Sequence, residues 1–338
     1  MVPALAVAGA LRAEGAEVVF VGGERAEREL VPAAGFELRQ IGAEGLSRSN
    51  PLRAALALAR AAGATAGAAR ILRELRPAAV LGGGGYIAGP VGLAAALRRT
   101  PLVLSEADSH LGLANRLLAP FAKRVCLAFP LAKRAGSRYL VTGRPLPPPA
   151  TDREAARRRF GVNEGEPLVV VFGGSLGARS INEASTDALK DAPFHVLHIA
   201  GARDYPALRE RELGDRYDLR SYLDLDDFGA ALLASDLVVA RAGGSVHEIA
   251  GYGRPAVLVP YPHATGDHQT TNARWMSDAG AAVVIADAEL DGPRLARTVG
   301  ELLGDRSRLA AMRRASAELA RPDAARAVAA ELLAAASS

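Results

Sequence analysis

The chain has 338 residues, 49% of them apolar and 23% charged, which is the composition of a globular protein long enough for two domains. Arginines interrupt every alanine-rich stretch, so no apolar run reaches the ~18 residues of a membrane span, and no secretory leader opens the sequence. The net charge of +4 permits an acidic partner such as a nucleotide, a phosphate or an anionic lipid, and the single cysteine excludes an internal disulfide and a cysteine-based zinc site.

The beginning of the chain has the pattern of a helix. Residues 2–8 read as the first turns of a helix, and the next strand follows at Val18–Val21. A doubly wound domain ordinarily opens with a strand and a Gly-rich turn before that helix. We therefore expect that a start site placed too late, or a truncation, has removed the first strand and the first Gly-rich loop.

Short apolar runs alternate with longer helical patterns through the rest of the chain. The runs are continuous, as in parallel strands that helices cover on both faces. This alternation predicts doubly wound α/β sheets. The predicted strands are Val18–Val21, Ala79–Leu81, Leu102–Leu104, Val125–Phe129 (with Cys126 as a core residue), Tyr139–Val141, Leu168–Phe172, His195–Ile199, Leu219–Leu223, Leu237–Ala240, Ala256–Val259 and Ala282–Ile285.

A proline-rich segment divides the chain. Gly143–Asp152 holds four prolines among ten residues, which excludes helix and central strand and stiffens the connection. We therefore predict two α/β domains, residues 1–145 and 146–320, with a ligand site in the cleft between them. Residues 321–338 are predicted to form a C-terminal helix that packs back on the first domain.

A Gly-rich turn follows the predicted strand Leu168–Phe172. Gly173-Gly174-Ser175-Leu176-Gly177 leads directly into a helix-forming stretch. One interpretation is a tight turn, since glycine reaches backbone angles that other residues avoid. The other is an anion cradle at a helix N-terminus, in which Ser175 donates its hydroxyl to a phosphate oxygen and Arg179 lies just beyond. The stretch has neither the Walker pattern nor G-x-G-x-x-G.

A second Gly-rich stretch, Arg241–Glu248, stands at another strand end. Ser245 and Glu248 have the S-x-x-E spacing of a helix capping box. Alternatively, the glycine turn contacts a diphosphate while the two oxygens of Glu248 accept both hydroxyls of a ribose. On these residues alone the cap is the favoured interpretation.

A polar loop, Pro260–Gln269, holds two histidines and an aspartate within six residues. No second cluster supplies further metal ligands, and His195 and His198 lie on a predicted buried strand. A loop that offers His268 and Gln269 to a sugar is therefore favoured over a metal site.

Two more stretches have a structural and a functional interpretation. Leu81–Pro90 contains four consecutive glycines, which fit either a flexible loop or an anion or glycan site. Asp224–Asp227 resembles a metal-binding D-x-D. However, acidic residues before the predicted helix Phe228–Ser235 favour a helix start instead.

Together these stretches resemble one family, the bacterial UDP-N-acetylglucosamine:N-acetylmuramyl-(pentapeptide) pyrophosphoryl-undecaprenol N-acetylglucosaminyltransferases of glycosyltransferase family 28. The similarity runs from Val2 to about Ala320. Its most specific parts are Gly84-Gly85-Tyr86, Gly112-Leu113-Ala114-Asn115, Phe172–Arg179, Arg241–Glu248 and His263–Asn272.

The resemblance implies a GT-B fold, in which two Rossmann-like domains face each other across a cleft. It also implies inverting transfer of N-acetylglucosamine from UDP-N-acetylglucosamine (UDP-GlcNAc) to the muramyl C4 hydroxyl of lipid I. The product, lipid II, serves peptidoglycan synthesis and hence cell shape and division. No cofactor, metal or nucleic acid is implied.

The resemblance further implies a set of site residues. On the acceptor side these are Gly84, Gly85, Tyr86 and Asn115. The implied donor contacts are Gly174 and Ser175 at the diphosphate, Leu225 near uracil, Gly244, Ser245, Val246, His247 and Glu248 around the nucleotide, His268 and Gln269 at the sugar, and Asp108 and Arg144.

The chain departs from the family's pattern in its first half. The family's first Gly-rich loop, which ends in a histidine and is a candidate location of the catalytic base, is missing before Val2. Glu106-Ala107-Asp108 stands where relatives have Glu-Gln-Asn, and Pro147 stands at the usual arginine position, with Arg144 nearby. Asp108 and His110 are then the candidates for the general base. If the given sequence is the complete chain, we expect weak or absent turnover with retained UDP binding.

Because the acceptor carries a polyprenyl tail, the resemblance implies a peripheral protein on the cytoplasmic face of the bacterial inner membrane. A helix predicted from Pro51 fits either an anionic lipid surface or an ordinary solvated face. It combines Leu52, Leu56, Leu58 and Ile71 with Arg53, Arg60, Arg70, Arg73 and Arg76. Other cell-wall synthesis proteins are further candidate partners.

Three alternatives to this function stay open on the sequence. One is a different UDP-sugar glycosyltransferase that acts on a glycolipid or a natural product. Another is UDP-N-acetylglucosamine 2-epimerase, which shares the architecture. The third is a noncatalytic UDP-sugar-binding protein, favoured if the first Gly-rich loop is truly absent.

Overall fold

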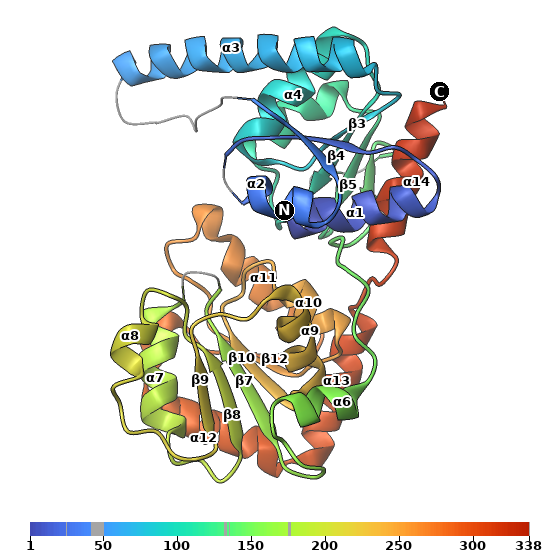
Figure 1. The fold of residues 1–338 in the computed structure, drawn as a ribbon. Helices are drawn as coiled ribbons and strands as arrows, with labels where there is room; N and C mark the ends of the chain where they lie inside the picture. The colour runs from blue at the N-terminus through green and yellow to red at the C-terminus, as the bar shows by residue number, and fades with distance from the viewer. Residues whose placement is uncertain (25, 42–50, 132–133, 135, 175–176, 338) are drawn as a thin grey trace. The chain divides into compact units, whose positions relative to one another are not determined.

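The chain forms two compact units, Met1–Pro147 with Arg321–Ser338 and Pro148–Ala320. The computed structural model describes residues 1–24, 26–41, 51–131, 134, 136–174 and 177–337. For residues 51–60 it describes the backbone alone. The two units divide after Pro147, inside the segment Gly143–Asp152, which has neither helix nor strand. Each unit contains its own parallel sheet (Figure 1).

The described part of the first unit holds a two-stranded parallel sheet, β1-β2, and a four-stranded parallel sheet in the order β3-β4-β5-β6. Its strands are β1 (Val19–Gly22), β2 (Glu37–Gln40), β3 (Val80–Gly82), β4 (Leu102–Glu106), β5 (Arg124–Leu127) and β6 (Tyr139–Val141). Its helices are α1 (Val2–Ala13), α2 (Glu27–Ala33), α3 (Pro51–Leu75), α4 (Gly85–Leu97), α5 (Leu113–Leu118), the 3-10 turn η1 (Ala119–Phe121) and α14 (Ala324–Ala336).

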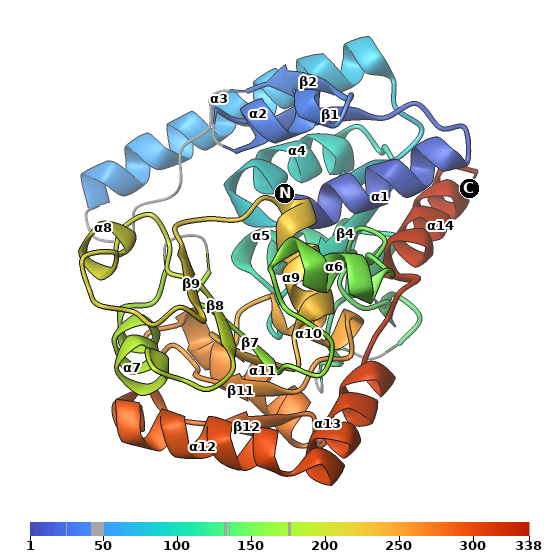
Figure 2. The same cartoon turned by 60° about the horizontal axis from the view of Figure 1, so that its bottom comes forward.

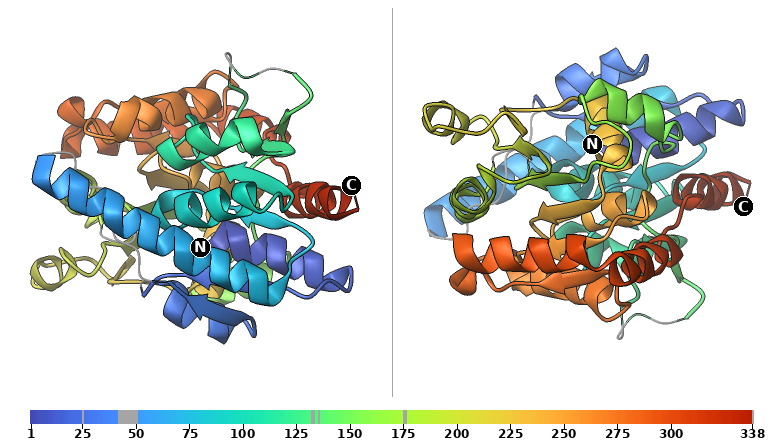
Figure 3. Two further views of the ribbon diagram at one scale, coloured as in Figure 1. Left: turned by 90° about the horizontal axis from the view of Figure 1, so that it is seen from above. Right: turned by 90° about the horizontal axis from the view of Figure 1, so that it is seen from below.

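The alternation of side chains along β4 divides the core of the first unit into two layers, because successive residues of a strand point to opposite faces. Leu102 and Leu104 pack with residues of α3 and α4, and α3 lies along α4 (Figure 3). Val103 points to the other face, where it packs with Cys126 and with Val328 of α14. The last helix of the chain is therefore part of the first unit's core.

The second unit contains one parallel sheet in the order β12-β11-β10-β7-β8-β9. Its strands are β7 (Leu168–Phe172), β8 (His195–Ile199), β9 (Tyr217–Arg220), β10 (Leu237–Ala240), β11 (Ala256–Leu258) and β12 (Ala282–Val284). Its helices are α6 (Arg153–Arg159), α7 (Arg179–Leu189), α8 (Tyr205–Leu208), α9 (Leu225–Ala234), α10 (Val246–Gly251), η2 (Thr265–Asp267), α11 (His268–Ser277), η3 (Asp287–Glu289), α12 (Gly292–Gly304) and α13 (Arg306–Glu318).

Helices cover both faces of this second sheet. Val169 and Val171 of β7 pack with Ile181 of α7 and Leu295 of α12, and these two helices lie side by side (Figure 2). On the other face, the ring of Phe172 meets the ring of Phe228 in α9 edge to face, with centroids 5.0 Å apart. Because β7 is covered on both faces, all five of its residues are buried, as the continuous apolar run predicts.

The predicted alternation of parallel strands and helices is confirmed, and three details of the prediction are wrong. The strand predicted at Leu219–Leu223 lies at Tyr217–Arg220. The strand β2 was not predicted, because the side chains of Glu37–Gln40 are largely exposed and polar, so they leave no apolar run. The helix predicted at Phe228–Ser235 begins earlier, at Leu225, because the side chain of Asp224 caps it by accepting from Asp227 N–H at 2.7 Å. The helix-start interpretation of Asp224–Asp227 is thereby confirmed.

Candidate functional site

The order of strands in the second sheet reverses between β7 and β10. From β7 the chain continues outward through β8 and β9, and from β10 it continues outward on the other side through β11 and β12. Phe172 and Ala240, the last residues of these two neighbouring strands, lie in register. In open α/β sheets, ligands bind at such a reversal, outside the carboxyl ends of the strands. Both Gly-rich stretches, from Gly173 and from Arg241, begin there.

The turn after β7 needs its glycines for two different reasons. A Cβ atom on Gly173 would lie 2.3 Å from Ala178 N, and one on Gly177 would lie 2.1 Å from the carbonyl oxygen of Ala200, so both approaches are too close for any side chain. Gly174 has a φ of 95° and faces open space among the described atoms. The turn is therefore tightly packed at Gly173 and Gly177 and open at Gly174. The tight-turn interpretation and the anion-cradle interpretation of its sequence are thus compatible. Ser175 and Leu176 lie outside the described residues.

The helix α7 begins directly at this turn. Its first residues, from Arg179, follow Ala178 as N-cap, and no side chain of the described residues caps the helix. The first N–H groups of a helix have no partner within the helix and carry a partial positive charge.

A buried polar network holds the turn from behind. Asn182 of α7 donates from Nδ2 to the carbonyl oxygen of Ala200 (2.9 Å), the same oxygen that Gly177 approaches. The Oδ1 of Asn182 is 3.0 Å from His198 Nε2, and His198 Nδ1 is 2.8 Å from the hydroxyl of Tyr217. Burial lowers the pKa of His198 to about 3, so its ring stays neutral. The network joins α7, β8 and β9 beneath the turn.

The second Gly-rich stretch leads into α10. Ser245 is the N-cap residue but makes no side-chain capping hydrogen bond, so the capping box favoured from the spacing of Ser245 and Glu248 is not formed. Ser245 already has helical backbone angles (φ −61°, ψ −13°), whereas a capping residue usually has an extended backbone. Glu248 and Gly244 are partly exposed, Val246 and His247 are buried, and the His247 ring lies 4.7 Å from that of Trp275.

Arg241, at the start of this stretch, connects the ends of three strands. Its Nη1 donates to Asp287 Oδ1 (2.6 Å) beyond β12, and to the carbonyl oxygens of Val259 (3.1 Å) and Pro260 (3.3 Å) after β11. Its Nη2 donates to Ser180 Oγ in α7 (2.8 Å). The sequence pattern pointed to this stretch but not to this role of Arg241. The signal for it was an arginine directly after a fully apolar strand, a place where a charge must find several partners.

The loop after β11 brings Gln269 beside the second Gly-rich stretch. The side-chain oxygen of Gln269 accepts from Tyr261 N–H (3.0 Å), and its Nε2 lies 4.0 Å from where a Cβ on Gly243 would stand. Asn272, one turn later, is fully buried and donates to the carbonyl oxygen of Ala242 (3.0 Å). His268 Nδ1 lies 2.9 Å from the carbonyl oxygen of Thr265. The helix α11 is therefore tied directly to the stretch after β10.

Leu225 opens α9 with 45% of its surface exposed. The contact of Phe228 with Phe172 holds the first turn of α9 at the end of β7. The structure thus gathers Gly174, Leu225, Gly244, Glu248 and Gln269 around the ends of β7, β10 and β11. Within the described residues, no group of three or more metal-ligating side chains is found.

The site residues predicted in the first unit lie around Glu106. This buried carboxylate accepts from Gly112 N–H (2.8 Å), Asn115 Nδ2 (3.0 Å) and Asp108 N–H (3.2 Å). Asn115 also donates to the carbonyl oxygen of Ser105 (3.1 Å). Glu106 therefore fixes the loop that carries Asp108 and His110, both partly exposed.

The four-glycine stretch of the first unit ends next to this loop. Gly84 and Gly85 both have a φ of 78°, and a Cβ on Gly84 would lie 3.5 Å from Asn115 Nδ2. The hydroxyl of Tyr86 lies 2.8 Å from where a Cβ on Gly23 would stand. Arg144 Nη1 lies 3.5 Å from the carbonyl oxygen of Ala107. The structure thus groups Gly84, Asn115, Asp108 and Arg144 at one end of β3 and β4.

Residues 1–127 match the glycosyltransferase family 28 N-terminal domain, and residues 168–328 match the family's C-terminal domain. The UDP-N-acetylglucosamine--N-acetylmuramyl-(pentapeptide) pyrophosphoryl-undecaprenol N-acetylglucosamine transferase of Rubrobacter xylanophilus is 41% identical to the chain, over 97% of this chain and 98% of that protein. The chain belongs to this family of N-acetylglucosamine transferases.

The crystal structure of Acinetobacter baumannii MurG agrees with this transferase family membership. It superposes with a TM-score of 0.77 at 29% identity, over 98% of this chain and 95% of that one. A putative UDP-N-acetylglucosamine 2-epimerase from Listeria monocytogenes, covering 96% of this chain and 90% of its own at 16% identity, has a TM-score of 0.71 and shares the fold alone. The two-domain α/β GT-B fold expected of the transferase family is confirmed.

Proposed function

We propose that this chain transfers N-acetylglucosamine from UDP-GlcNAc to the C4 hydroxyl of the muramyl sugar of lipid I, releasing UDP and forming lipid II. Membership of the transferase family supports this reaction. The observation that carries the donor half is the meeting of two Gly-rich turns where the strand order reverses, between Phe172 and Ala240. This is where α/β sheets bind nucleotides.

In the proposed donor complex, the diphosphate lies at Gly174 and Ser175, in line with the start of α7. Negative charge develops on this diphosphate as the anomeric carbon separates from it. The uncapped N–H groups at the start of α7 are oriented before the reaction, so they stabilise that charge with little reorganisation. The network of Asn182 and His198 keeps the turn in place.

The remaining donor contacts follow from the positions of the side chains. Glu248 accepts the two ribose hydroxyls with its two oxygens. Leu225 offers an exposed apolar surface to the uracil ring. Gln269 and His268 stand at the sugar, with Gln269 already tied to the backbone of Tyr261. We assign Gly244, Val246 and His247 to the wall around the nucleotide.

In the first unit, Gly84, Gly85, Tyr86 and Asn115 are assigned to the acceptor. The general base that deprotonates the C4 hydroxyl is sought at Asp108 and His110, on the loop that Glu106 fixes. Arg144 Nη1 lies 3.5 Å from the carbonyl oxygen of Ala107, which precedes Asp108 in the chain, and Asp108 and Arg144 complete the proposed donor set.

The experiment is transfer of label from UDP-GlcNAc to a lipid I analogue, with UDP affinity measured separately by calorimetry. Glu248→Gln keeps the shape but removes the charge, and we expect UDP affinity to fall roughly tenfold, about 1.4 kcal/mol. Glu301→Gln, at an exposed position of α12, is the matched control. Unchanged UDP affinity in Glu248→Gln would overturn the donor assignment, and transfer from another sugar nucleotide in preference to UDP-GlcNAc would overturn the choice of substrate.

We further propose that the first unit binds the membrane surface that holds lipid I. None of the described helices is both long and apolar enough to cross a bilayer. Ile71, predicted to face lipid, packs instead against the core, and the predicted Leu52, Leu56, Leu58, Arg53 and Arg60 have side chains outside the described part.

Five of the exposed apolar side chains described in this unit lie on two neighbouring helices and the turn that follows them. They are Leu93 and Leu97 of α4, Leu113 and Leu117 of α5, and Phe121 of η1. The two helices pack so closely that a Cβ on Gly92 would lie 2.4 Å from the side chain of Leu118. Exposed cations accompany them at Arg98, Arg99, Arg116 and Lys123. An apolar surface with basic residues around it suits an anionic leaflet.

A further inference from the structure

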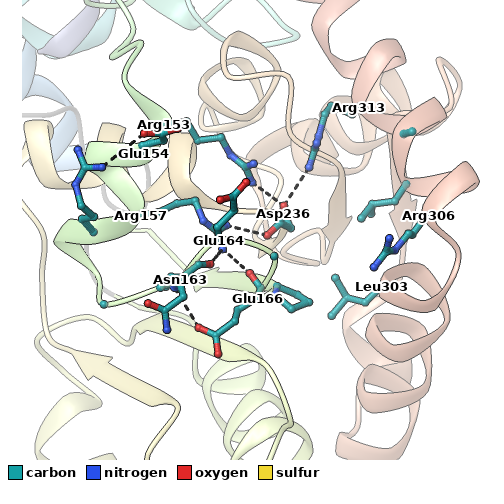
Figure 4. A pocket seen from close by; sticks show the side chains of 17 residues that line it. Arg153, Glu154, Arg157, Asn163, Glu164, Glu166, Asp236, Leu303, Arg306 and Arg313 are labelled. Atoms are coloured by element: carbon teal, nitrogen blue, oxygen red, sulfur yellow. Dashed lines mark hydrogen bonds and ion pairs between the residues drawn. The ribbon is translucent and has the colours of Figure 1, made fainter.

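A hollow of about 960 Å³ opens at the amino-terminal edge of the second unit's sheet, at the end opposite to the Gly-rich turns. It is bounded by α6 and the loop 161–167 on one side and by α12 and α13 on the other (Figure 4). Asp236, which directly precedes β10, lies at its base. None of the residues assigned above to donor or acceptor lines it.

The carboxylate of Asp236 is already saturated by the protein's own donors. Its Oδ1 accepts from Arg153 Nη2 (2.6 Å) and Arg313 Nη2 (3.2 Å), and its Oδ2 accepts from Arg157 Nη1 (3.2 Å) and Leu168 N–H (3.0 Å). A carboxylate has about four lone-pair sites, so this one has none left for a further donor. Three guanidinium groups thus share a single negative charge.

Further guanidinium N–H groups around the hollow lack an acceptor. Arg313, whose side chain is 40% exposed, donates from Nη2 to Asp236, and its Nη1 has no acceptor among the described residues. Arg306, the first residue of α13, is exposed and forms no ion pair within the described part of the chain. Unpaired donors of this kind, at a concave surface, are the complement of an anion.

Arg254, just behind the hollow, shows that positive charge is in excess here. It is 7% exposed, its Nη1 donates to the carbonyl oxygen of Ser235 (2.9 Å), and its buried Nε has no partner in the described structure. Burial, followed by repulsion from Arg153 and Arg313, lowers the pKa of Arg254 to about 10. Two of the acidic side chains nearby already pair with other cations. Glu166 pairs with His195 and Arg216, and Glu154 pairs with Arg158. Of the glutamates that line the hollow, this leaves Glu164 without such a pair in the part of the chain that the structure describes.

We propose that this hollow binds a small anion through a diphosphate group, held by Arg306 and Arg313 on one wall and by the Nη1 of Arg153 on the other. The Nε and Nη2 of Arg153 already donate to the carbonyl oxygens of Leu233, Ala234 and Ser235 and to Asp236. The planar fork of a guanidinium matches adjacent phosphate oxygens. The volume falls in the range of small-molecule sites. Guanidinium groups outnumber carboxylates around the hollow, so a ligand with more than one negative charge is favoured. A diphosphate carries two or more. The site is separate from the proposed donor site, at the other end of the same sheet.

The test is calorimetric titration of the full chain with inorganic pyrophosphate in a buffer free of phosphate and sulfate. We expect the wild-type protein to bind one more pyrophosphate than the double variant Arg306→Ala, Arg313→Ala. Pyrophosphate that binds at the donor turns stays in both proteins, so failure of the donor assignment does not change this difference. Repeating the titration with UDP distinguishes a nucleotide from inorganic diphosphate as the source of the group.

Arg314→Ala is the matched control, since Arg314 is exposed on the same helix and does not line the hollow. Because Arg313→Ala removes one partner of Asp236, the single variant Arg306→Ala, which breaks no described contact, is measured as well. We expect it to weaken pyrophosphate binding at least tenfold while thermal unfolding stays unchanged. Equal stoichiometry and affinity in wild type and variants, or an equal loss in Arg314→Ala, would overturn the site.

Discussion

Arg241 and Asp287 join the carboxyl ends of β10 and β12 through a hydrogen bond of 2.6 Å, although 46 residues separate them along the chain. Both side chains are largely buried, and Ser180 of α7 bonds to each of them, to Arg241 at 2.8 Å and to Asp287 at 2.7 Å. The guanidinium of Arg241 thus couples the second Gly-rich stretch to α7, the helix that begins at the first Gly-rich turn. The two halves of the proposed donor site therefore hold a fixed spacing.

Arg241→Lys should loosen this spacing while keeping the charge. A lysine cannot supply the planar fork that reaches Asp287, Ser180 and two carbonyl oxygens together. We expect the second unit to lose about 1–3 kcal/mol of stability, and KM for UDP-GlcNAc to rise roughly tenfold, about 1.4 kcal/mol. Denaturant unfolding and initial-rate kinetics measure the two effects. Arg297→Lys, at an exposed position of α12, is the control. An unchanged KM would show that the coupling does not reach the donor.

Comparing Gly177→Ala with Gly280→Ala separates two costs of adding a Cβ atom: strain in a left-handed backbone and collision with a neighbouring atom. The two glycines have φ values of 77° and 78°, but a Cβ on Gly177 would meet the Ala200 carbonyl oxygen at 2.1 Å, whereas one on Gly280 would meet open space. We expect Gly280→Ala to cost about 1–2 kcal/mol from the left-handed backbone alone. Gly177→Ala adds about 1–3 kcal/mol of overpacking and should also weaken UDP binding. Equal losses of unfolding free energy would contradict the packing at Ala200.

The neutral ring of His198 predicts a pH dependence of stability. Its pKa is about 3 in the folded protein because of burial, against 6.5 as the reference. Between these values the unfolded chain binds a proton here that the folded chain does not. Stability is therefore fully present above pH 6.5 and falls below it by about 1.4 kcal/mol per pH unit, or roughly 2 kcal/mol by pH 5.

The measurement is urea denaturation between pH 5 and 8. In His198→Gln the residue at this position no longer titrates, so the contribution of His198 to the slope should vanish. The exposed His263→Gln serves as control and should keep the wild-type slope. If His198→Gln keeps it as well, the ring is not buried as described.

Leu97→Ser, Leu117→Ser and Phe121→Ser together test the membrane surface. These side chains are exposed by 63–73%, and each contributes on the order of 1 kcal/mol when it enters an apolar phase. We expect binding to phosphatidylglycerol-containing vesicles, measured by flotation, to fall roughly tenfold or more. Leu140→Ser with Val141→Ser, on the edge strand β6, is the control. Equal flotation of the two variants, or binding independent of anionic lipid, would contradict the proposal.

The sequence by itself determined the class of fold, because local patterns decide it. Short, continuous runs of β-branched residues such as Val169–Val171 predict strands buried on both faces, and the prolines at 145 and 147–149 mark the connection. Asp224 was recognisable as a helix start, since capping acts over three residues. The motifs around Gly173, Arg241 and Gln269 also identified the family before their positions were known.

Only the tertiary structure decided which residues work together. The spacing of Ser245 and Glu248 favoured a capping box, yet the backbone of Ser245 is already helical and the cap is absent. Arg241 meets Asp287, and Asp236 gathers Arg153, Arg157 and Arg313, through contacts that span 46 to 83 residues. Strand order and register bring such residues together, and because these are set by packing across the whole sheet, no local stretch of sequence contains them.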